Sequence, residues 1–403
     1  MTAGLLGAFA ALACGPTSQA ADLSERLEST LEEFRIRHAF PGATAAIALP
    51  DGRVASAAVG LADVEAARPM TAQTPMLAAS IGKTFVAATV LRLESEQRLA
   101  RDDLLAEHLG HRPWFTGLPN ASSITLDHLL HHTAGLPDHV HLPEFQPIWS
   151  RAMASGTGIS PEDLIGVVTG LEPLFEPGSA WAYSDTGYIL LGLVIEQVSG
   201  ESYNEMVDRY FIKPLGLNDT RPSDRPDLPG LAVGYVAADN LFGLPERTAD
   251  AAGNLLWNPA IEWTGGGLAS TAPDLALWGQ LLLTGQAMDV EYLDRLLAGV
   301  PVDARSTDAF YGAGVGIHPD TPRGPVYGHG GWIPGYVSSL RHYADHEVTV
   351  AFQINTDASI QGSAGDLVPD LEAALADLAL AAVSQPSVDG NRMSVTSATK
   401  NGK

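Results

Sequence analysis

The stretch "AASIGKTFVAATVLRL", residues 78–93, holds one of only four lysines in a chain of 403 residues. No charged side chain occurs between Phe85 and Leu91, so a helix here is apolar around most of its circumference, which predicts that it is buried. Lys83 lies on this helix. Ser80 lies one turn earlier, where free backbone N–H groups and the helix dipole stabilise negative charge. The segment therefore predicts a buried helix that begins with a hydroxyl and an amine.

Gly82, Lys83 and Thr84 also match the end of a phosphate-binding loop. Such a loop needs a second glycine five residues before Gly82, because its backbone must curl until its N–H groups point at phosphate. Leu77 stands at that position, and Ile81 adds another bulky side chain. The sequence therefore argues against a phosphate loop.

A spacing of three residues places the Lys83 amine within reach of the Ser80 hydroxyl. Burial without an anion lowers the pKa of a lysine, and such an amine accepts a proton near neutral pH. We therefore interpret Ser80 as a nucleophile and Lys83 as its helper; the alternative is a helix cap and a lysine that extends into solvent. The spacing alone does not decide, because Ser397 and Lys400 repeat it in the polar tail.

Two further segments carry chemically reactive side chains. "YSDTGYILLGLVIEQVSG", residues 183–200, places Tyr183 and Asp185 just before a helix with an apolar stripe. "VYGHGGW", residues 326–332, places His329 on a strand, followed by two glycines. Adjacent glycines weaken a strand and usually mark the close approach of another backbone or of a ligand.

These groups resemble the three motifs of the serine β-lactamase and penicillin-binding-protein superfamily, in the same order along the chain. They are Ser80-Ile81-Gly82-Lys83, Tyr183-Ser184-Asp185 and His329-Gly330-Gly331. They are most similar to its class C-related branch of esterases, D-aminopeptidases and D-alanyl-D-alanine carboxypeptidases. Other stretches that resemble this branch are "ITLDHLLHHTAGLP" (124–137), "FIKPLGLNDT" (211–220) and "GGGLASTAPDLALWGQLLL" (265–283). The similarity covers residues 25–382.

The resemblance implies a serine acyl-transfer mechanism. Ser80 attacks a carbonyl and forms a covalent acyl-enzyme, which water then releases, while Lys83 and Tyr183 take and return the proton. The backbone N–H groups of Ser80 and Trp332 are expected to form the oxyanion hole. The substrate-binding residues that the motifs imply are Asp185, His329, Gly330 and Gly331. No cofactor and no metal ion are implied.

Two positions depart from the family's pattern. Asp185 stands where the family usually has Asn, and a carboxylate beside Lys83 favours the charged ammonium and raises its pKa. The sequence therefore favours Tyr183 as the principal base, with its pKa depressed by Lys83, whose charge acts as electrostatic support. Gly330 replaces a hydroxyl residue that would donate to the carboxylate of β-lactams and C-terminal peptides. Its loss favours neutral esters or amides.

Patterns at the two ends of the chain predict the architecture. An Asp51-Gly52 turn joins two short strand patterns within residues 43–59, and strand patterns return over residues 326–355 before a closing helix. We expect an α/β (α+β) fold with one antiparallel sheet from both termini, flanked by helices, and an inserted, mostly helical region. The resemblance makes this fold β-lactamase/transpeptidase-like. The expected catalytic domain covers residues 22–383, with its α/β part in 22–62 and 310–383 and its helical part in 63–309.

The net charge of −24, from 47 acidic and 23 basic residues, repels phosphate backbones and anionic lipids, so we expect no nucleic-acid partner. Residues 1–21 contain an apolar stretch too short to span a bilayer but typical of an export signal, which predicts a periplasmic or secreted protein. Lipidation at Cys14, the only cysteine, is an alternative. Residues 384–403 are expected to form a flexible tail.

The preferred function is that of an esterase, or of a peptidase or amidase directed at D-amino acids, acting on a small-molecule ester, amide or peptide. One alternative is a true β-lactamase or D-alanyl-D-alanine carboxypeptidase. Another is a binding protein of the same fold that has lost turnover, for which Asp185 is the indication. A third is a zinc hydrolase, although no His-Glu-x-x-His order is present. It would use His128, His131, His132, His139 and His141.

Overall fold

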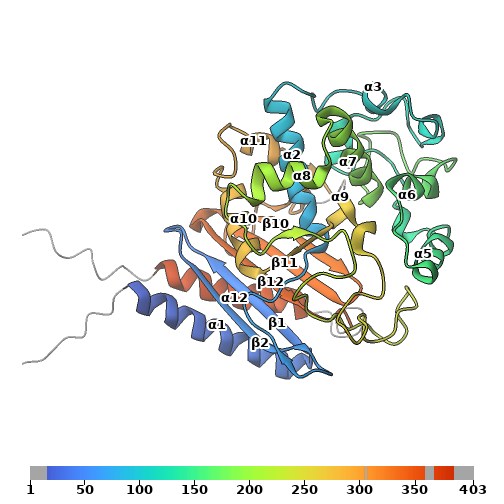
Figure 1. The fold of residues 1–403 in the computed structure, drawn as a ribbon. Helices are drawn as coiled ribbons and strands as arrows, with labels where there is room; N and C mark the ends of the chain where they lie inside the picture. Colours follow the sequence, from blue (N-terminus) through green and yellow to red (C-terminus); the bar gives the residue numbers. More distant parts are fainter. Residues whose placement is uncertain (1–15, 304, 306, 359–366, 385–403) are drawn as a thin grey trace, which may run out of the picture.

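The two ends of the chain build one nine-stranded antiparallel sheet (Figure 1). The computed structural model describes residues 16–303, 305, 307–358 and 367–384, with side chains from residue 22 onward. Across the sheet the strands are β3 (Arg68–Pro69), β2 (Val54–Asp63), β1 (Gly42–Ala48), β12 (Val348–Ile354), β11 (Tyr336–Tyr343), β10 (Val326–Ile333), β9 (Gly316–His318), β8 (Phe310–Tyr311) and β7 (Val300–Pro301). The N-terminal hairpin joins the C-terminal strands where Ala43 pairs with Ile354.

Short turns set the register of the two main hairpins. Gly52, at φ +83°, lies in the turn between β1 and β2, where its N–H donates to Leu49 O at 3.0 Å. Pro334 and Gly335 form the two-residue turn between β10 and β11, and Gly335 has a φ of +86°. Glycine adopts this left-handed region without a steric penalty. The turns therefore fix which side chains face each side of the sheet.

Helices α1 (Pro16–His38) and α12 (Leu367–Ser384) cover one face of the sheet and lie side by side in Figure 1. Leu27 of α1 and Leu371 of α12 are fully buried in one apolar cluster with Phe352 of β12. Removal of these side chains from water is the main force that holds both chain ends on the sheet.

The other face of the sheet carries the inserted helical region. Helix α10 (Ala272–Leu283) packs on β1, β11 and β12. Phe85 of α2 (Lys83–Ser95) stacks on Trp278 of α10, with ring centroids 3.9 Å apart. Ten of the thirteen residues of α2 are buried, so the predicted burial of this helix is confirmed. Other helices of the region are α3 (Leu105–Leu109), α4 (Leu126–Leu130), α5 (Phe145–Ser155), α6 (Pro161–Val168), α7 (Asp185–Ser199), α8 (Tyr203–Val207), α9 (Trp263–Gly266) and α11 (Leu293–Leu296).

A small three-stranded sheet lies just before α2. β4 (Met76–Leu77) pairs with β6 (Leu268–Ser270), which also pairs with β5 (Arg221–Pro222). Ala78, the residue that follows β4, donates its N–H to Leu268 O at 2.8 Å. This sheet ties the start of α2 to a segment far along the chain.

The predicted architecture is confirmed, because both termini contribute to one antiparallel sheet and a mostly helical region lies between them. The exact domain boundaries stay predictions. Helix α1 begins at Pro16, inside the segment 1–21 that the sequence assigns to an export signal, whereas Cys14 and residues 385–403 lie outside the described part. Within the described ranges, no helix combines the length and apolar character that a membrane span requires.

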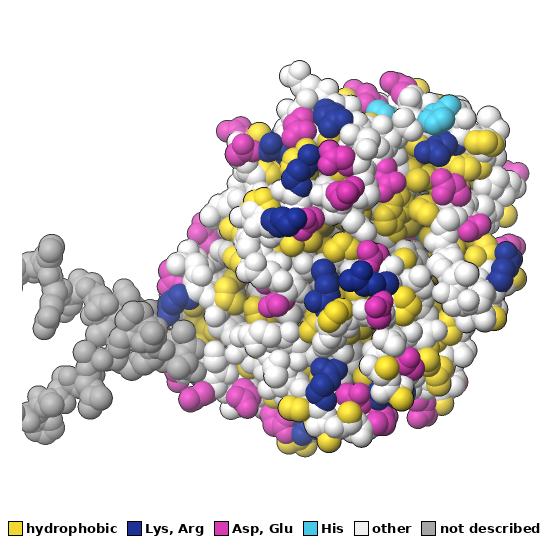
Figure 2. Space-filling model, viewed as in Figure 1, with side chains coloured by type: hydrophobic (Ala, Val, Ile, Leu, Met, Phe, Trp, Pro, Cys, Tyr) yellow, Lys and Arg dark blue, Asp and Glu magenta, His cyan; other side chains and the backbone are white. Residues whose placement is uncertain are grey.

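Acidic and basic side chains are interspersed on the face shown in Figure 2. Lys and Arg occur there singly or in small groups among Asp and Glu. The negative excess of the chain is therefore spread over this face rather than gathered at one point.

The first prediction concerns the sheet and its two covering helices. Leu27→Ala should lower the free energy of unfolding by about 2–5 kcal/mol, because it leaves a cavity in a fully buried position. Ile36→Ala on the same helix is the matched control; its side chain is 70% exposed, so the change should stay within about 0.5 kcal/mol. Thermal unfolding followed by circular dichroism measures both. Equal melting temperatures for the two variants would show that this packing does not hold the helix.

Candidate active site

Ser80 stands at a sharp entry into the buried helix α2. It belongs to the 3₁₀ turn η1 (Ala79–Gly82), which runs directly into α2. Ala79 has a left-handed φ of +48°. This conformation is unfavourable for any residue that has a side chain, and it persists only where the surroundings impose it. Ser80 therefore reaches the adjoining cavity from a strained turn.

Three glycines let other backbone segments press against this turn. A Cβ on Gly82 would lie 2.9 Å from Gly266 Cα, and a Cβ on Gly266 would lie 2.5 Å from the Ala79 carbonyl carbon. A Cβ on Gly331 would lie 2.4 Å from Ala78 O. Favourable carbon contacts begin near about 3.5 Å, so a larger residue at any of these positions would displace the turn.

The Lys83 side chain is completely buried, and its ammonium has three polar partners. Nζ donates to Ser80 Oγ at 3.1 Å and to the carbonyl of Gly265, and it forms an ion pair with the Asp185 carboxylate. Two of the three N–H donors of the ammonium are therefore used in hydrogen bonds, and its charge faces a carboxylate. Lys83 is therefore placed as a cation that donates to the Ser80 oxygen rather than as an amine that accepts its proton.

Electrostatics favour the same charge state. Burial alone would lower the pKa of Lys83, but the Asp185 carboxylate and Tyr183 outweigh it and raise that pKa above its usual value. Burial would likewise raise the pKa of Asp185, but the Lys83 charge lowers it. The expectation that Asp185 raises the pKa of Lys83 is confirmed.

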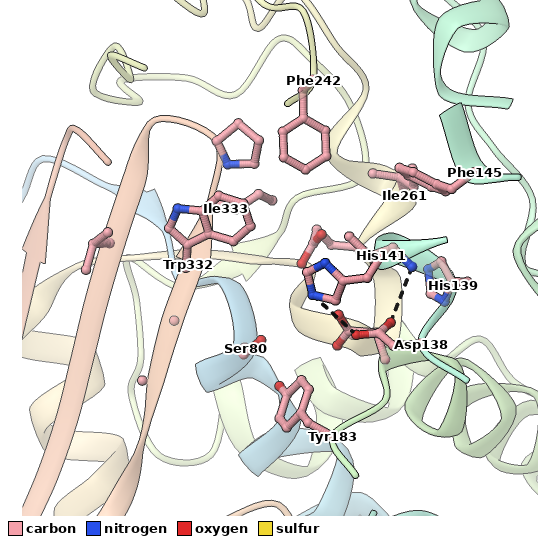
Figure 3. A pocket seen from close by; sticks show the side chains of 18 of the residues that line it. Ser80, Asp138, His139, His141, Phe145, Tyr183, Phe242, Ile261, Trp332 and Ile333 are labelled. Atoms are coloured by element: carbon pink, nitrogen blue, oxygen red, sulfur yellow. Dashed lines mark hydrogen bonds and ion pairs between the residues drawn. The ribbon is translucent and has the colours of Figure 1, made fainter. Parts of the chain in front are cut away.

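Tyr183 lies just before α7 and faces Ser80 across the site (Figure 3). Lys83 Nζ is 5.0 Å from the centroid of the Tyr183 ring. The hydroxyl oxygen is buried, and no described residue meets it with good hydrogen-bond geometry, although Lys83 and Ser80 are close enough to lower its pKa. Burial disfavours the phenolate and raises the pKa of Tyr183 by more than the Lys83 charge lowers it. The expected lowering by Lys83 is therefore present, but burial outweighs it, which the sequence did not reveal.

Strand β10 carries the third motif along one wall of the site. His329 is buried, and its Nε2 lies 2.9 Å from the hydroxyl of Tyr311, which the sequence did not single out. The predicted close approach of another backbone is confirmed for Gly331. At Gly330, which lines the cavity, the approach of a ligand stays a prediction. Gly330 is exposed, and the atom nearest to a Cβ built there is Arg341 Nη2 at 3.9 Å. A hydroxyl side chain would therefore fit at this position.

The backbone N–H of Trp332 points toward the open edge of β10. Ile333 and Tyr336 are partners on either side of the two-residue turn. In such a hairpin the residues that flank the turn form the hydrogen-bonded pair, which directs the N–H of the preceding residue, Trp332, away from β11. Within the described strands, β9 pairs with β10 only at residues 326–328. This part of the edge can therefore offer a donor to an oxygen atom in the cavity.

A largely apolar cavity of about 490 Å³ opens beside Ser80 (Figure 3). Its size is in the usual range for sites that bind small molecules. Trp149 Nε1 donates to Phe242 O at 2.9 Å and holds part of the wall in place. Aromatic residues that line the cavity are Phe145, Trp149, Tyr183, Phe242, Trp257 and Trp332.

Two carboxyl groups that the sequence did not single out also line this cavity. Asp138 precedes the short turn η3 (His139–His141), and Glu262 precedes α9. Burial and the nearby Asp185 carboxylate raise the pKa of Asp138 to about 7 and that of Glu262 to about 8. Asp138 has His141 Nε2 at 3.7 Å, whereas no described residue forms a hydrogen bond or an ion pair with the Glu262 carboxyl. Neither carboxyl group therefore forms an ion pair with a Lys or Arg among the described residues.

The histidines of the zinc alternative point in different directions. His131 bonds to the carbonyl oxygens of Asp127 and Ala298, while His139 Nδ1 lies 3.0 Å from Thr186 Oγ1. In the ranges that the structure describes, no three or more His, Cys, Asp or Glu side chains gather so that they could hold a metal ion. The arrangement gives the zinc alternative no support.

Comparison with known proteins places the chain in a family. Residues 27–375 match the family model described as Beta-lactamase. Penicillin-binding protein 4* of Bacillus subtilis (strain 168) is 27% identical over 342 residues, which are 83% of this chain and 72% of that protein. Esterase EstB of Burkholderia gladioli is 34% identical over 237 residues, 57% of this chain and 55% of the esterase. The solved structure of a D-stereospecific amidohydrolase from Streptomyces sp. has a TM-score of 0.70 and 27% identity, covering 84% of this chain and 94% of that one.

A serine hydroxyl beside a buried lysine and a tyrosine, next to an apolar cavity, is an arrangement typical of serine hydrolases. The chain belongs to the Beta-lactamase family, whose model matches most of its length. It is a serine hydrolase, in agreement with the esterase and the amidohydrolase among its relatives.

The close glycine contacts yield a test of how Ser80 is held. Gly266→Ala should lower kcat at least about tenfold, because the added methyl group pushes on the Ala79–Ser80 peptide, and a shift of about 1 Å costs up to about 10²-fold in rate. Gly166→Ala in α6 is the matched control, since a Cβ there meets nothing within 4 Å. Steady-state kinetics of the two folded variants measure kcat for comparison with the wild-type enzyme. Wild-type kcat in Gly266→Ala would refute this account of the turn.

The ion pair yields a test of pH dependence. The Asp185 charge raises the pKa of Tyr183, so Asp185→Asn should lower that pKa. A reaction that needs ionised Tyr183 speeds up as pH rises through this pKa, so the rising limb of kcat/KM should move to lower pH in the variant. Profiles of kcat/KM against pH for both proteins measure this. A limb that stays in place or moves to higher pH would contradict the assignment.

Proposed function

We propose that the protein hydrolyses amides or esters through a covalent acyl-enzyme, with Ser80 as nucleophile, Tyr183 as base and Lys83 as a fixed cation. The observation that carries this proposal is the buried ammonium of Lys83, which donates to Ser80 Oγ at 3.1 Å and to the Gly265 carbonyl and is paired with the Asp185 carboxylate. A cation in that place stabilises the developing serine alkoxide. It leaves Tyr183, in its ionised form, as the neighbouring group that can accept the proton.

The proposed reaction runs in two halves. Ser80 Oγ attacks the substrate carbonyl while its proton passes to the ionised oxygen of Tyr183, and the backbone N–H groups of Ser80 and Trp332 donate to the oxyanion. Tyr183 then gives the proton to the leaving group as the acyl bond breaks. In the second half a water molecule attacks the acyl-enzyme, loses its proton to Tyr183 and frees Ser80, which regains the proton.

The cavity supports a substrate with a bulky apolar group next to the scissile carbonyl. Phe145, Trp149 and Trp257 offer aromatic surface that such a group can cover. Gly330 supplies no hydroxyl donor for a substrate carboxylate, and β-lactams and C-terminal peptides carry one. The site therefore favours neutral acyl groups over β-lactams.

Among such substrates, Asp138 and Glu262 favour an amide or ester of an amino acid with a free amino group. Both carboxyl groups line the cavity beside Ser80, and burial and the nearby Asp185 carboxylate raise their pKa values. A substrate ammonium would supply the missing positive charge. The D-stereospecific amidohydrolase among the similar structures supports an amide substrate of D configuration.

One substrate panel tests the proposed function. We expect D-phenylalanine p-nitroanilide to be cleaved with a kcat/KM at least about tenfold above its N-acetyl derivative, because acetylation removes the ammonium. Glu262→Gln should lower the ratio of the two kcat/KM values and leave kcat/KM for the N-acetyl substrate unchanged. Ser80→Ala should abolish turnover of both.

Further substrates separate the alternatives. A short-chain p-nitrophenyl ester preferred over both anilides would identify an esterase without amine recognition, and a preference for nitrocefin would identify a β-lactamase. Labelling of Ser80 by a fluorophosphonate without turnover of any substrate would identify the silent binding protein. Undiminished turnover by Ser80→Ala would refute the serine mechanism.

We also propose that the protein is exported to the periplasm or secreted. The support is the apolar stretch in residues 1–21, with lipidation of Cys14 as the alternative way of export. Fractionation of cells that express the full chain, with mass spectrometry of the mature N-terminus, tests this. A cytoplasmic protein with an uncleaved N-terminus would contradict it.

A further inference from the structure

We propose that His132 is a positioning residue that holds Tyr183 at the reacting atoms. This inference rests on the proposed role of Tyr183 as the base. His132 follows helix α4, is buried, and has a left-handed φ of +58°. A residue with a side chain keeps this conformation only where its surroundings hold it there.

His132 accepts hydrogen bonds from the backbone on both sides of Tyr183. Ala182, one residue before, donates its N–H to His132 O at 3.0 Å. Ser184, one residue after, donates its N–H to His132 Nδ1 at 3.2 Å. A single residue therefore fixes the direction in which the chain enters and leaves Tyr183.

The imidazole ring of His132 also supports the Tyr183 ring. The two ring centroids lie 4.2 Å apart, with an angle of 37° between the planes. The rings of Tyr311 and Tyr188 lie 4.7 Å and 5.1 Å from the same imidazole. His132 thus forms the centre of an aromatic group behind the proposed base.

The hydrogen bonds identify His132 as a neutral ring. Nδ1 accepts from Ser184, so the proton of the neutral ring lies on Nε2, which is buried and has no hydrogen-bond partner among the described residues. Burial and the Lys83 charge hold the pKa of His132 well below its ordinary value. A neutral His132 supports Tyr183 without competing for the proton.

Tyr183 needs this support because the described residues near its hydroxyl, Lys83 and Ser80, do not hold it with good hydrogen-bond geometry. Its hydroxyl oxygen meets no described residue with good hydrogen-bond geometry. The orientation of the phenol therefore depends on its backbone and on ring packing, and His132 contributes to both.

Two substitutions separate the contribution of the His132 hydrogen-bond acceptor from that of its imidazole ring. His132→Ala and His132→Asn both remove the imidazole, but Asn keeps a side-chain acceptor near the position of Nδ1 and tolerates positive φ. We expect kcat to fall at least about tenfold in His132→Ala with KM within about twofold, and His132→Asn to recover most of the loss. His131→Asn is the matched control, because that buried neighbour bonds to backbone oxygens of Asp127 and Ala298 and should leave kcat unchanged.

A double-mutant cycle with Tyr183→Phe shows whether His132 acts through Tyr183. If it does, adding His132→Ala to Tyr183→Phe should lower kcat no further. The inference would be overturned if the losses of kcat in the two single variants were additive in the double variant, or if His132→Ala kept the kcat of the wild-type enzyme. In either case a slow Tyr183→Phe enzyme would leave the proposed function intact. If Tyr183→Phe kept the kcat of the wild-type enzyme, the proposed role of Tyr183 as the base would be refuted instead. If His132→Ala does not fold, His132→Gln, whose acceptor is displaced by one bond, takes its place in the cycle.

Discussion

The buried ion pair between Lys83 and Asp185 is the constraint on which the rest of the site depends. Each ion loses several kcal/mol of solvation on leaving water, and a pair repays this only when its remaining polar atoms are also satisfied. Here Ser80 Oγ and the Gly265 carbonyl accept hydrogen bonds from the ammonium. The positive charge is therefore fixed beside the Ser80 oxygen, and for this reason we propose Tyr183 rather than Lys83 as the base.

The fold explains how such a pair is assembled from distant parts of the chain. Lys83 comes from the buried helix α2, and Asp185 begins α7. Gly265 belongs to α9, whose next residue, Gly266, presses directly on the strained turn before Ser80. The sheet from both termini brings β10 against the same turn through Gly331. Each contact needs a residue without a side chain, so the strain at Ala79 is held by its neighbours.

Much of this could be predicted from the sequence, because the signals are local. The charge-free run after Lys83 predicts burial, the two terminal strand patterns predict the sheet, and the glycine pair in β10 predicts the close contact at Gly331. The net pKa of Tyr183 could not be predicted, because the desolvation of its hydroxyl depends on how completely the surrounding segments close over it. Burial outweighs the Lys83 charge there.

Other residues of the site carry no local signal. Asp138, Glu262 and Phe242 lie in or beside irregular segments, and only the tertiary structure brings them to one cavity. His132 could be read equally well as a zinc ligand or as a core residue. Its contacts on both sides of Tyr183 depend on the path of a segment about fifty residues later.

The charge state of Lys83 tests the central claim most directly. With only four lysines in the chain, the enzyme can be labelled with ¹³C at lysine Cε and each signal assigned by substitution. The account predicts that the Lys83 signal keeps the shift of an ammonium from about pH 6 to about pH 10, and changes in Asp185→Asn. Titration of Lys83 near neutral pH in the wild-type enzyme would make it a free amine and contradict the account.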